Sequence, residues 1–147
     1  MPYGAVGAKS VHVPTKYKES SAAGQNDIGN DVGVMVLKSN MGNRTGYFGI
    51  RKVAREESIT GQSVVLSGYP SDKGINMVKS SGTVLDTQKD RITYNNDTVG
   101  GNSGCPVYIQ GDDSNYYAVA VHSSGSENYN IGRKITDAVF NWFASFR

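Results

Sequence analysis

The sequence predicts an all-β fold that ends in a helix. Short runs of apolar and β-branched residues recur along the chain, most of them bounded by glycine, proline, serine or asparagine. Glycine accounts for 18 of the 147 residues, about 12% against a usual 7% or so, which suits many tight turns between short strands. Only at the end of the chain do apolar residues recur at helical spacing.

The first third of the sequence predicts two strands joined by a loop. The alternating run from Ser10 to Pro14 indicates a short strand that a proline ends. Lys18 to Asn30 is rich in small polar residues and predicts a surface loop. Asp31 then heads an almost unbroken apolar run up to Leu37, which predicts a strand buried on both faces. By itself, Asp31 has an ordinary explanation as a turn residue before that strand.

The remaining elements follow from the same patterns. Residues 43–49 predict a turn and a strand, and the polar stretch 51–62 is expected to cross between two β halves. Antiparallel strands are expected at 63–70, 77–85 and 91–94. Thr136 can cap a closing helix. One face of that helix would carry the apolar residues Ala138, Val139, Trp142, Phe143 and Phe146.

Composition excludes several classes of function. A net charge of +2 is too small to suggest a nucleic acid or an anionic membrane as partner. No apolar run approaches the roughly 18 residues of a membrane span. The single cysteine permits no internal disulfide, and no cluster of carboxylates suggests calcium. From composition we therefore expect no nucleic acid, membrane, cofactor or metal as a partner.

The stretch from Thr98 to Val107 carries the strongest signal for chemistry. Its glycines surround one serine, Ser103, and allow a tight loop that turns backbone N–H groups toward one point. A hydroxyl beside preset donors is the arrangement that acyl transfer requires. The same Gly101-Asn102-Ser103-Gly104 run is also common turn chemistry in β proteins, so an unrelated β-rich binding protein remains an alternative.

This loop, together with the later run from Ala118 to Gly125, resembles the nucleophile region of chymotrypsin-like serine proteases, and most closely of V8-like glutamyl endopeptidases. The segment from Ser67 to Lys73 resembles another stretch typical of that branch. The resemblance covers essentially the whole chain, from Pro2 onward, but only the later two thirds of a typical member.

The resemblance implies a chymotrypsin-like double β-barrel with an incomplete first barrel and a C-terminal helix. Residues 1–57 would be the remaining part of the N-terminal barrel, 58–135 the C-terminal barrel and 136–147 the helix. Ser103 would be the nucleophile and Asp31 the triad carboxylate. The N–H groups of Gly101 and Ser103 would form the oxyanion hole.

It also implies how a substrate is bound. Thr98 and His122 would line the primary specificity pocket, where an imidazole N–H and a hydroxyl can hold a glutamate side chain. Cleavage after Glu is therefore expected, and cleavage after Asp more weakly, because its shorter side chain cannot reach both donors. Ser123, Ser124 and Gly125 would pair with the substrate backbone by strand addition. Taken alone, a histidine ending an apolar strand is more often structural.

Two residues depart from related sequences. The larger trypsin-like group has aspartate just before the nucleophile, whereas Asn102 carries no charge and cannot pair with an α-amine. Cys105 stands where relatives commonly have serine, and we interpret it as a small, poorly exposed residue rather than as the nucleophile.

The general base is missing from its expected place. The family's chain order is His, Asp, Ser, with roughly forty residues between the first two, and that count runs off the start of this chain. His12 precedes Asp31, as the family's order requires, but it stands only nineteen residues before it and lacks the Ala-His sequence that is usual around the catalytic histidine. The simplest explanation is a truncated sequence whose missing part also holds a secretion signal, because no signal peptide is visible at Met1.

Two main functions remain open. One, implied by the resemblance, is an extracellular, secreted serine endopeptidase of glutamyl type, a monomer that acts on protein or peptide substrates. In this truncated form it is expected to have little activity. The other is a non-catalytic trypsin-like remnant that keeps the pocket and the strand edge and binds peptides without turnover.

Overall fold

The structure is a computed structural model that describes residues 3–25 and 27–146. The strands, in chain order, are β1 (Ala8–His12), β2 (Val34–Leu37), β3 (Gly49–Ile50), β4 (Ser63–Gly68), β5 (Val78–Thr87), β6 (Arg91–Tyr94), β7 (Pro106–Gln110), β8 (Tyr116–Gly125) and β9 (Asn130–Lys134). The helices are α1 (Thr15–Ala22), α2 (Gly42–Thr45) and α3 (Asp137–Ala144), with short 3-10 turns η1 (Ile28–Asn30) and η2 (Ser71–Lys73).

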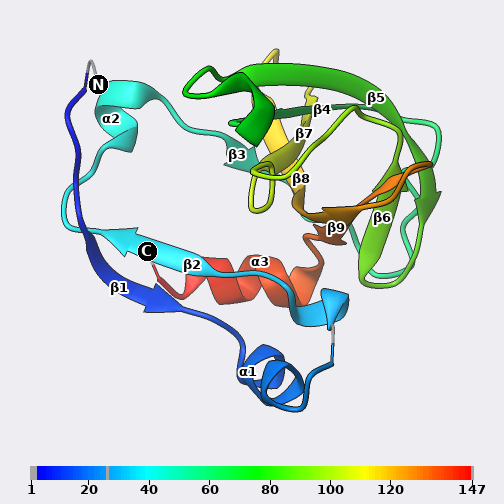
Figure 1. Ribbon diagram of the computed structural model, residues 1–147, viewed down its shortest axis with the longest axis horizontal. Helices are drawn as coiled ribbons and strands as arrows, with labels where there is room; N and C mark the ends of the chain where they lie inside the picture. The colour runs from blue at the N-terminus through cyan, green and yellow to red at the C-terminus, as the bar shows by residue number, and fades with distance from the viewer. Residues whose placement is uncertain (1–2, 26, 147) are drawn as a thin grey trace.

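Strands β4 to β9 form a closed antiparallel barrel (Figure 1). Their order is β8-β7-β4-β5-β6-β9, and β9 pairs back onto β8. The two-residue strand β3 adds to β8 in parallel. The barrel encloses a core of mainly β-branched and aromatic side chains, among them Val64, Leu66, Ile92, Tyr94, Val107 and Val119. This arrangement confirms the expected mostly β fold with a chymotrypsin-like barrel.

The strands of the barrel match the sequence pattern closely. In β4 the apolar residues Val64 and Leu66 are buried, while Ser63 is exposed, as alternation predicts. The strands expected at 63–70, 77–85 and 91–94 are confirmed, with ends that differ by a few residues. Segment 51–62 forms neither helix nor strand, and its residues Val53 and Ile59 join the barrel core; its role as the crossing between two β halves stays a prediction.

Outside the barrel, β1 and β2 form a two-stranded antiparallel ribbon (Figure 1). Val11 lies directly opposite Met35, and both side chains are more than half exposed. Leu37 is also exposed. The prediction that this second strand is buried on both faces was therefore wrong. An apolar run fixes the strand conformation, but burial needs a layer on each side, and among the described residues only one face is covered.

The loop predicted for residues 18–30 was wrong in its first half, where α1 forms. Pro14 at the N-cap has φ near −58°, which prepares the chain for a helix, and Lys, Glu and Ala in the following turns favour it. No residue of α1 is buried. Because the helix has no apolar face, hydrophobic periodicity could not indicate it. Asn26, within the same predicted loop, lies outside the described residues.

The closing helix is confirmed as α3, with Thr136 at its N-cap, although the Thr136 side chain makes no capping hydrogen bond. Val139 is buried in a second apolar cluster with Val32, Ala118 and Ile135. This cluster joins α3 to the barrel and to the segment just before β2.

The segment boundaries expected after residues 57 and 135 stay a prediction, and Met1, Pro2 and Arg147 lie outside the described residues. No helix in residues 3–25 and 27–146 combines the length and the apolar character needed to cross a membrane.

Candidate active site

The loop that carries Ser103 rests on the segment that follows β4. The amide of Ser71 donates to the carbonyl oxygen of Gly100 over 2.8 Å. A Cβ atom at Gly101 would lie 2.6 Å from the carbonyl oxygen of Tyr69, and the φ angle of Gly101 is +101°. Glycine is therefore required here both by backbone conformation and by close approach. The stretch from Ser67 to Lys73, which in the sequence only showed resemblance to the glutamyl endopeptidases, therefore packs against this loop and holds it in place.

On its other side the loop is bound to the end of β8. The amide of Gly104 donates to the carbonyl oxygen of His122 over 2.8 Å. The amide of His122 in turn donates to the carbonyl oxygen of Cys105 over 2.9 Å. Gly104 has a φ of +84°, which lets the chain turn into β7 directly after the serine. The loop is thus fixed at both ends by backbone hydrogen bonds.

Ser103 itself is exposed at the tip of this loop. Its hydroxyl donates to the carbonyl oxygen of Ser123 over 3.4 Å, a long bond that leaves the oxygen lone pairs free. Within the described part of the chain, the amides of Gly101 and Ser103 make no hydrogen bond. Two unpaired donors and an exposed hydroxyl therefore belong to one loop.

Asp31 reaches the same strand end from the other part of the molecule. It follows η1, and the hydroxyl of Ser123 donates to its carboxylate. Ser123 is thus bonded to Asp31 through its side chain and to Ser103 through its carbonyl group. Residues 31 and 103, far apart in the sequence, are brought within reach of one residue.

His122, the neighbour of Ser123, points into the barrel. It is 4% exposed, and its Nδ1 lies 2.6 Å from the hydroxyl of Tyr94 on β6. Burial lowers the pKa of His122 below its ordinary value, so the ring is neutral at neutral pH. Burial also raises the pKa of Tyr94 well above its ordinary range, so its hydroxyl keeps its proton.

The Thr98 side chain is held by hydrogen bonds that run through the side-chain amide of Asn130. Its hydroxyl donates to Oδ1 of Asn130, and Nδ2 of Asn130 donates to the carbonyl oxygen of Asn96 over 2.5 Å. An open cavity of about 390 Å³ lies beside these three residues, lined by residues 95–98 and 126–130. In this structure the Thr98 proton is directed at Asn130, so only the oxygen lone pairs of Thr98 remain available.

Beyond Val121, β8 continues without β7 at its side. The pairing of β7 with β8 ends at Pro106 and Val121, whereas β9 accompanies β8 as far as Gly125. Among the described residues, the edge formed by Ser123, Ser124 and Gly125 therefore has no strand partner on the side of Ser103. An extended peptide could pair there by strand addition.

Neither histidine of the chain is bonded to Ser103. Nε2 of His12 lies 2.9 Å from the hydroxyl of Ser10, and its ring packs on Phe146 at a centroid distance of 4.3 Å. His122 is bonded to Tyr94, as described above. A general base for Ser103 is thus not in place among the residues that the structure describes.

Cys105 is partly buried and packs against the barrel core. Its sulfur lies so close to Gly68 that a Cβ atom there would be 2.2 Å away. Burial raises the pKa of the Cys105 thiol, which keeps it in the less reactive protonated form.

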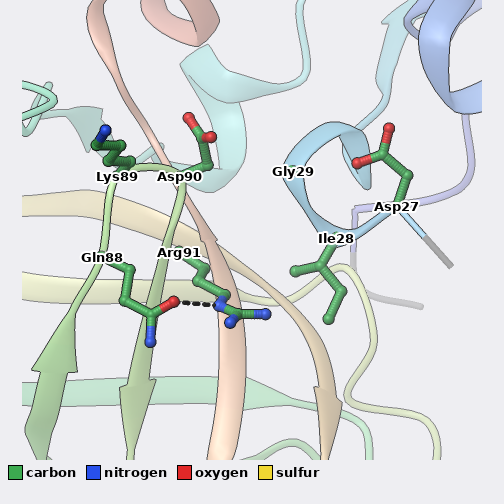
Figure 2. Close-up of a pocket in the computed structure, with 7 residues that line it drawn as sticks. All are labelled: Asp27, Ile28, Gly29, Gln88, Lys89, Asp90 and Arg91. Atoms are coloured by element: carbon green, nitrogen blue, oxygen red, sulfur yellow. Dashed lines mark hydrogen bonds between the residues drawn. The ribbon is translucent and has the colours of Figure 1, made fainter.

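A larger cavity, of about 450 Å³, lies between η1 and the turn from β5 to β6 (Figure 2). Asp27 and Asp90 project from its two sides, and Nε of Arg91 donates to Oε1 of Gln88 over 2.7 Å. None of its lining residues belongs to the predicted site. This cavity is lined by charged side chains, and none of its lining residues is a serine, threonine or cysteine.

Sequence reasoning missed two contributors to this region, Tyr94 and Asn130. Tyr94 had a signal, since it alternates inward with Ile92 in a predicted strand, and a buried tyrosine hydroxyl needs a partner. Nothing in the sequence indicated a role for Asn130, because its partner Thr98 lies 32 positions away and a local pattern does not link the two residues.

Known proteases have sequences similar to that of this chain. No protein-family model matches the chain. It is 32% identical over 153 residues to the glutamyl endopeptidase of Bacillus licheniformis, covering 96% of this chain and 46% of that protein. It is 31% identical over 141 residues to a protein of Bacillus subtilis named extracellular metalloprotease, covering 95% and 43%.

A solved structure is also similar. The structure of a Glu endopeptidase in complex with MPD superposes with a TM-score of 0.82 at 27% identity, covering 97% of this chain and 64% of that one. The chain spans about half the length of the curated relatives that it matches. Over nearly its whole length, the chain is a homologue of the V8-like glutamyl endopeptidases and has their chymotrypsin-like β-barrel fold.

Proposed function

We propose that this chain supplies the nucleophile and the substrate-binding surface of a secreted serine endopeptidase that cleaves after Glu, and Asp more weakly. The observation that carries the proposal is the position of Ser123, which is hydrogen-bonded both to Asp31 and to Ser103. These two bonds bring a carboxylate and an exposed serine to one strand end, beside the edge of β8 that we propose for peptide binding. The similarity to a glutamyl endopeptidase and to the solved structure of a Glu endopeptidase supports the proposed specificity.

In the proposed reaction, Oγ of Ser103 attacks the carbonyl carbon of the scissile bond and its proton passes to a base. The amides of Gly101 and Ser103 stabilise the negative charge on the carbonyl oxygen. The amine leaves with a proton from that base, and water then hydrolyses the acyl-enzyme. Asp31 would orient the base. The side chain of the residue before the scissile bond would receive its hydrogen bond from His122, and Thr98 would line the pocket with its hydroxyl proton directed at Asn130.

Because neither histidine is bonded to Ser103, we expect the 147-residue chain by itself to hydrolyse peptides slowly. The same observation favours a second candidate function, a non-catalytic module that binds peptides ending in Glu. One relative is named a metalloprotease, but no group of three or more His, Cys, Asp or Glu side chains in residues 3–25 and 27–146 could hold a metal ion. The described residues do not fit a metal centre.

Two measurements test the proposal. Isothermal titration calorimetry should show tighter binding of an acetylated peptide ending in Glu than of the matched peptide ending in Gln. Release of nitroaniline from a Glu-containing chromogenic peptide should be slow and should disappear in Ser103→Ala, while His12→Ala leaves it unchanged. Selective binding without Ser103-dependent turnover would favour the peptide-binding module. Equal binding of Glu and Gln peptides would contradict both functions.

A further inference from the structure

Tyr94 is a fully buried tyrosine whose hydroxyl has one hydrogen-bond partner among the described residues, Nδ1 of His122 at 2.6 Å. The two side chains come from β6 and β8, and β9 runs between these strands at Gly132. A Cβ atom at Gly132 would lie 3.2 Å from Cε1 of Tyr94, so the glycine leaves room for the ring to reach across. The contact is therefore built into the barrel rather than made by a surface side chain.

The direction of this hydrogen bond follows from burial. A neutral imidazole has one N–H group, and the other nitrogen can only accept. If Nδ1 carried the proton, it would donate to the Tyr94 oxygen, and the Tyr94 proton would have no acceptor among the described residues. A buried donor without a partner is costly. The favoured arrangement has Tyr94 donating to Nδ1, which places the His122 proton on Nε2.

Nε2 of His122 is available to a ligand. It makes no hydrogen bond within the described residues, and it is not among their fully enclosed, unpartnered polar atoms. The little surface that His122 retains therefore includes this nitrogen. Of the two donors that the resemblance implies for a glutamate side chain, the Thr98 hydroxyl is already directed at Asn130, so the Nε2–H group of His122 is the one that stays free.

We propose that Tyr94 is a positioning residue that holds His122 in the Nε2–H tautomer, so that the ring presents a donor to the side chain of a bound substrate. This inference rests on the proposed function of His122 in the specificity pocket. The opposite tautomer would present a lone pair, which repels a carboxylate and favours the amide NH₂ of Gln. Tyr94 would thereby favour Glu over Gln without contacting the substrate.

The protonation state of each ring nitrogen can be measured directly by nitrogen NMR of the ¹⁵N-labelled 147-residue chain at neutral pH. We expect a protonated Nε2 and an unprotonated Nδ1 for His122 in the unmodified protein, with His12 as an internal reference. In Tyr94→Phe we expect a shift toward the Nδ1–H form. Tyr108→Phe is the matched control, because it removes a phenol bonded to Ser67 in the same barrel and should leave the His122 signals unchanged.

The second readout is the preference of the same three proteins for the Glu over the Gln peptide, by calorimetry. Tyr94→Phe should lower this preference roughly two- to tenfold, the range of one lost hydrogen bond, and Tyr108→Phe should not. An Nδ1–H tautomer in the unmodified protein would overturn the inference even if Tyr94→Phe failed to fold, and so would an unchanged tautomer in Tyr94→Phe. The expected tautomers without any Glu preference would instead refute the proposed pocket.

Discussion

Replacing Gly101 with alanine tests whether the Ser103 loop is seated on the segment after β4. A side chain at φ +101° is strained, which costs about 1–2 kcal/mol. The new Cβ would also lie 2.6 Å from the carbonyl oxygen of Tyr69 and 3.0 Å from the amide nitrogen of Ser71, and these are backbone atoms that cannot rotate away. Overpacking of this kind costs about 1–3 kcal/mol more. We therefore expect Gly101→Ala to lose about 2–5 kcal/mol of unfolding free energy.

Gly104→Ala is the matched control for this experiment. Gly104 lies in the same loop at φ +84°, but a Cβ atom there would meet nothing within 4 Å. Only the conformational cost of about 1–2 kcal/mol should remain. Urea denaturation followed by the fluorescence of Trp142 measures both free energies. Equal losses in the two variants would refute the close approach of the loop to Tyr69.

Two further predictions concern the end of β8. Ser123→Ala removes the hydroxyl that donates to Asp31 and should lower the unfolding free energy by about 0.5–1.5 kcal/mol. Ser124→Ala is the control and should change the unfolding free energy by less than about 0.5 kcal/mol. Equal effects of the two substitutions in urea denaturation would count against the hydrogen bond from Ser123 to Asp31. Because burial lowers the pKa of His122 in the folded state, the unfolded chain binds more protons between that lowered value and the ordinary one. Unfolding free energy should therefore fall with decreasing pH through this window and then level off, and His122→Gln should flatten this part of the profile.

Much of the barrel could be predicted from local pattern. The strand from Ser63 to Gly68 alternates between exposed and buried residues, and this alternation is a property of the sequence itself. The strand from Val34 to Leu37 shows the limit of such reasoning. Its apolar run predicts the extended conformation, but whether a face is covered depends on what packs there, and Met35 is 60% exposed. Helix α1 was missed for the opposite reason, since it buries nothing and carries no periodic signal.

The site was predictable only in part, because a sequence gives residue types but not their partners. The glycines around Ser103 indicate a tight loop, and this signal can be read from the sequence. The bond from Ser123 to Asp31 spans 92 positions and that from Tyr94 to His122 spans 28. Pairings of this kind depend on barrel closure and register, which no local pattern encodes.

The alternation of β8 explains how one strand end can serve two parts of the site. Neighbouring side chains of a strand point to opposite faces, so His122 enters the barrel and meets Tyr94 while Ser123 turns outward to Asp31. The register of β8 against β9 shifts between His122 and Ser124, which makes this the point where the strand departs from regular pairing. A slip of one residue would exchange the two faces, sending serine toward Tyr94 and histidine toward Asp31. Two backbone hydrogen bonds, from the amide of Gly104 to the carbonyl oxygen of His122 and from the amide of His122 to the carbonyl oxygen of Cys105, hold this strand end against the Ser103 loop, next to both the proposed specificity group and the serine that binds the proposed carboxylate.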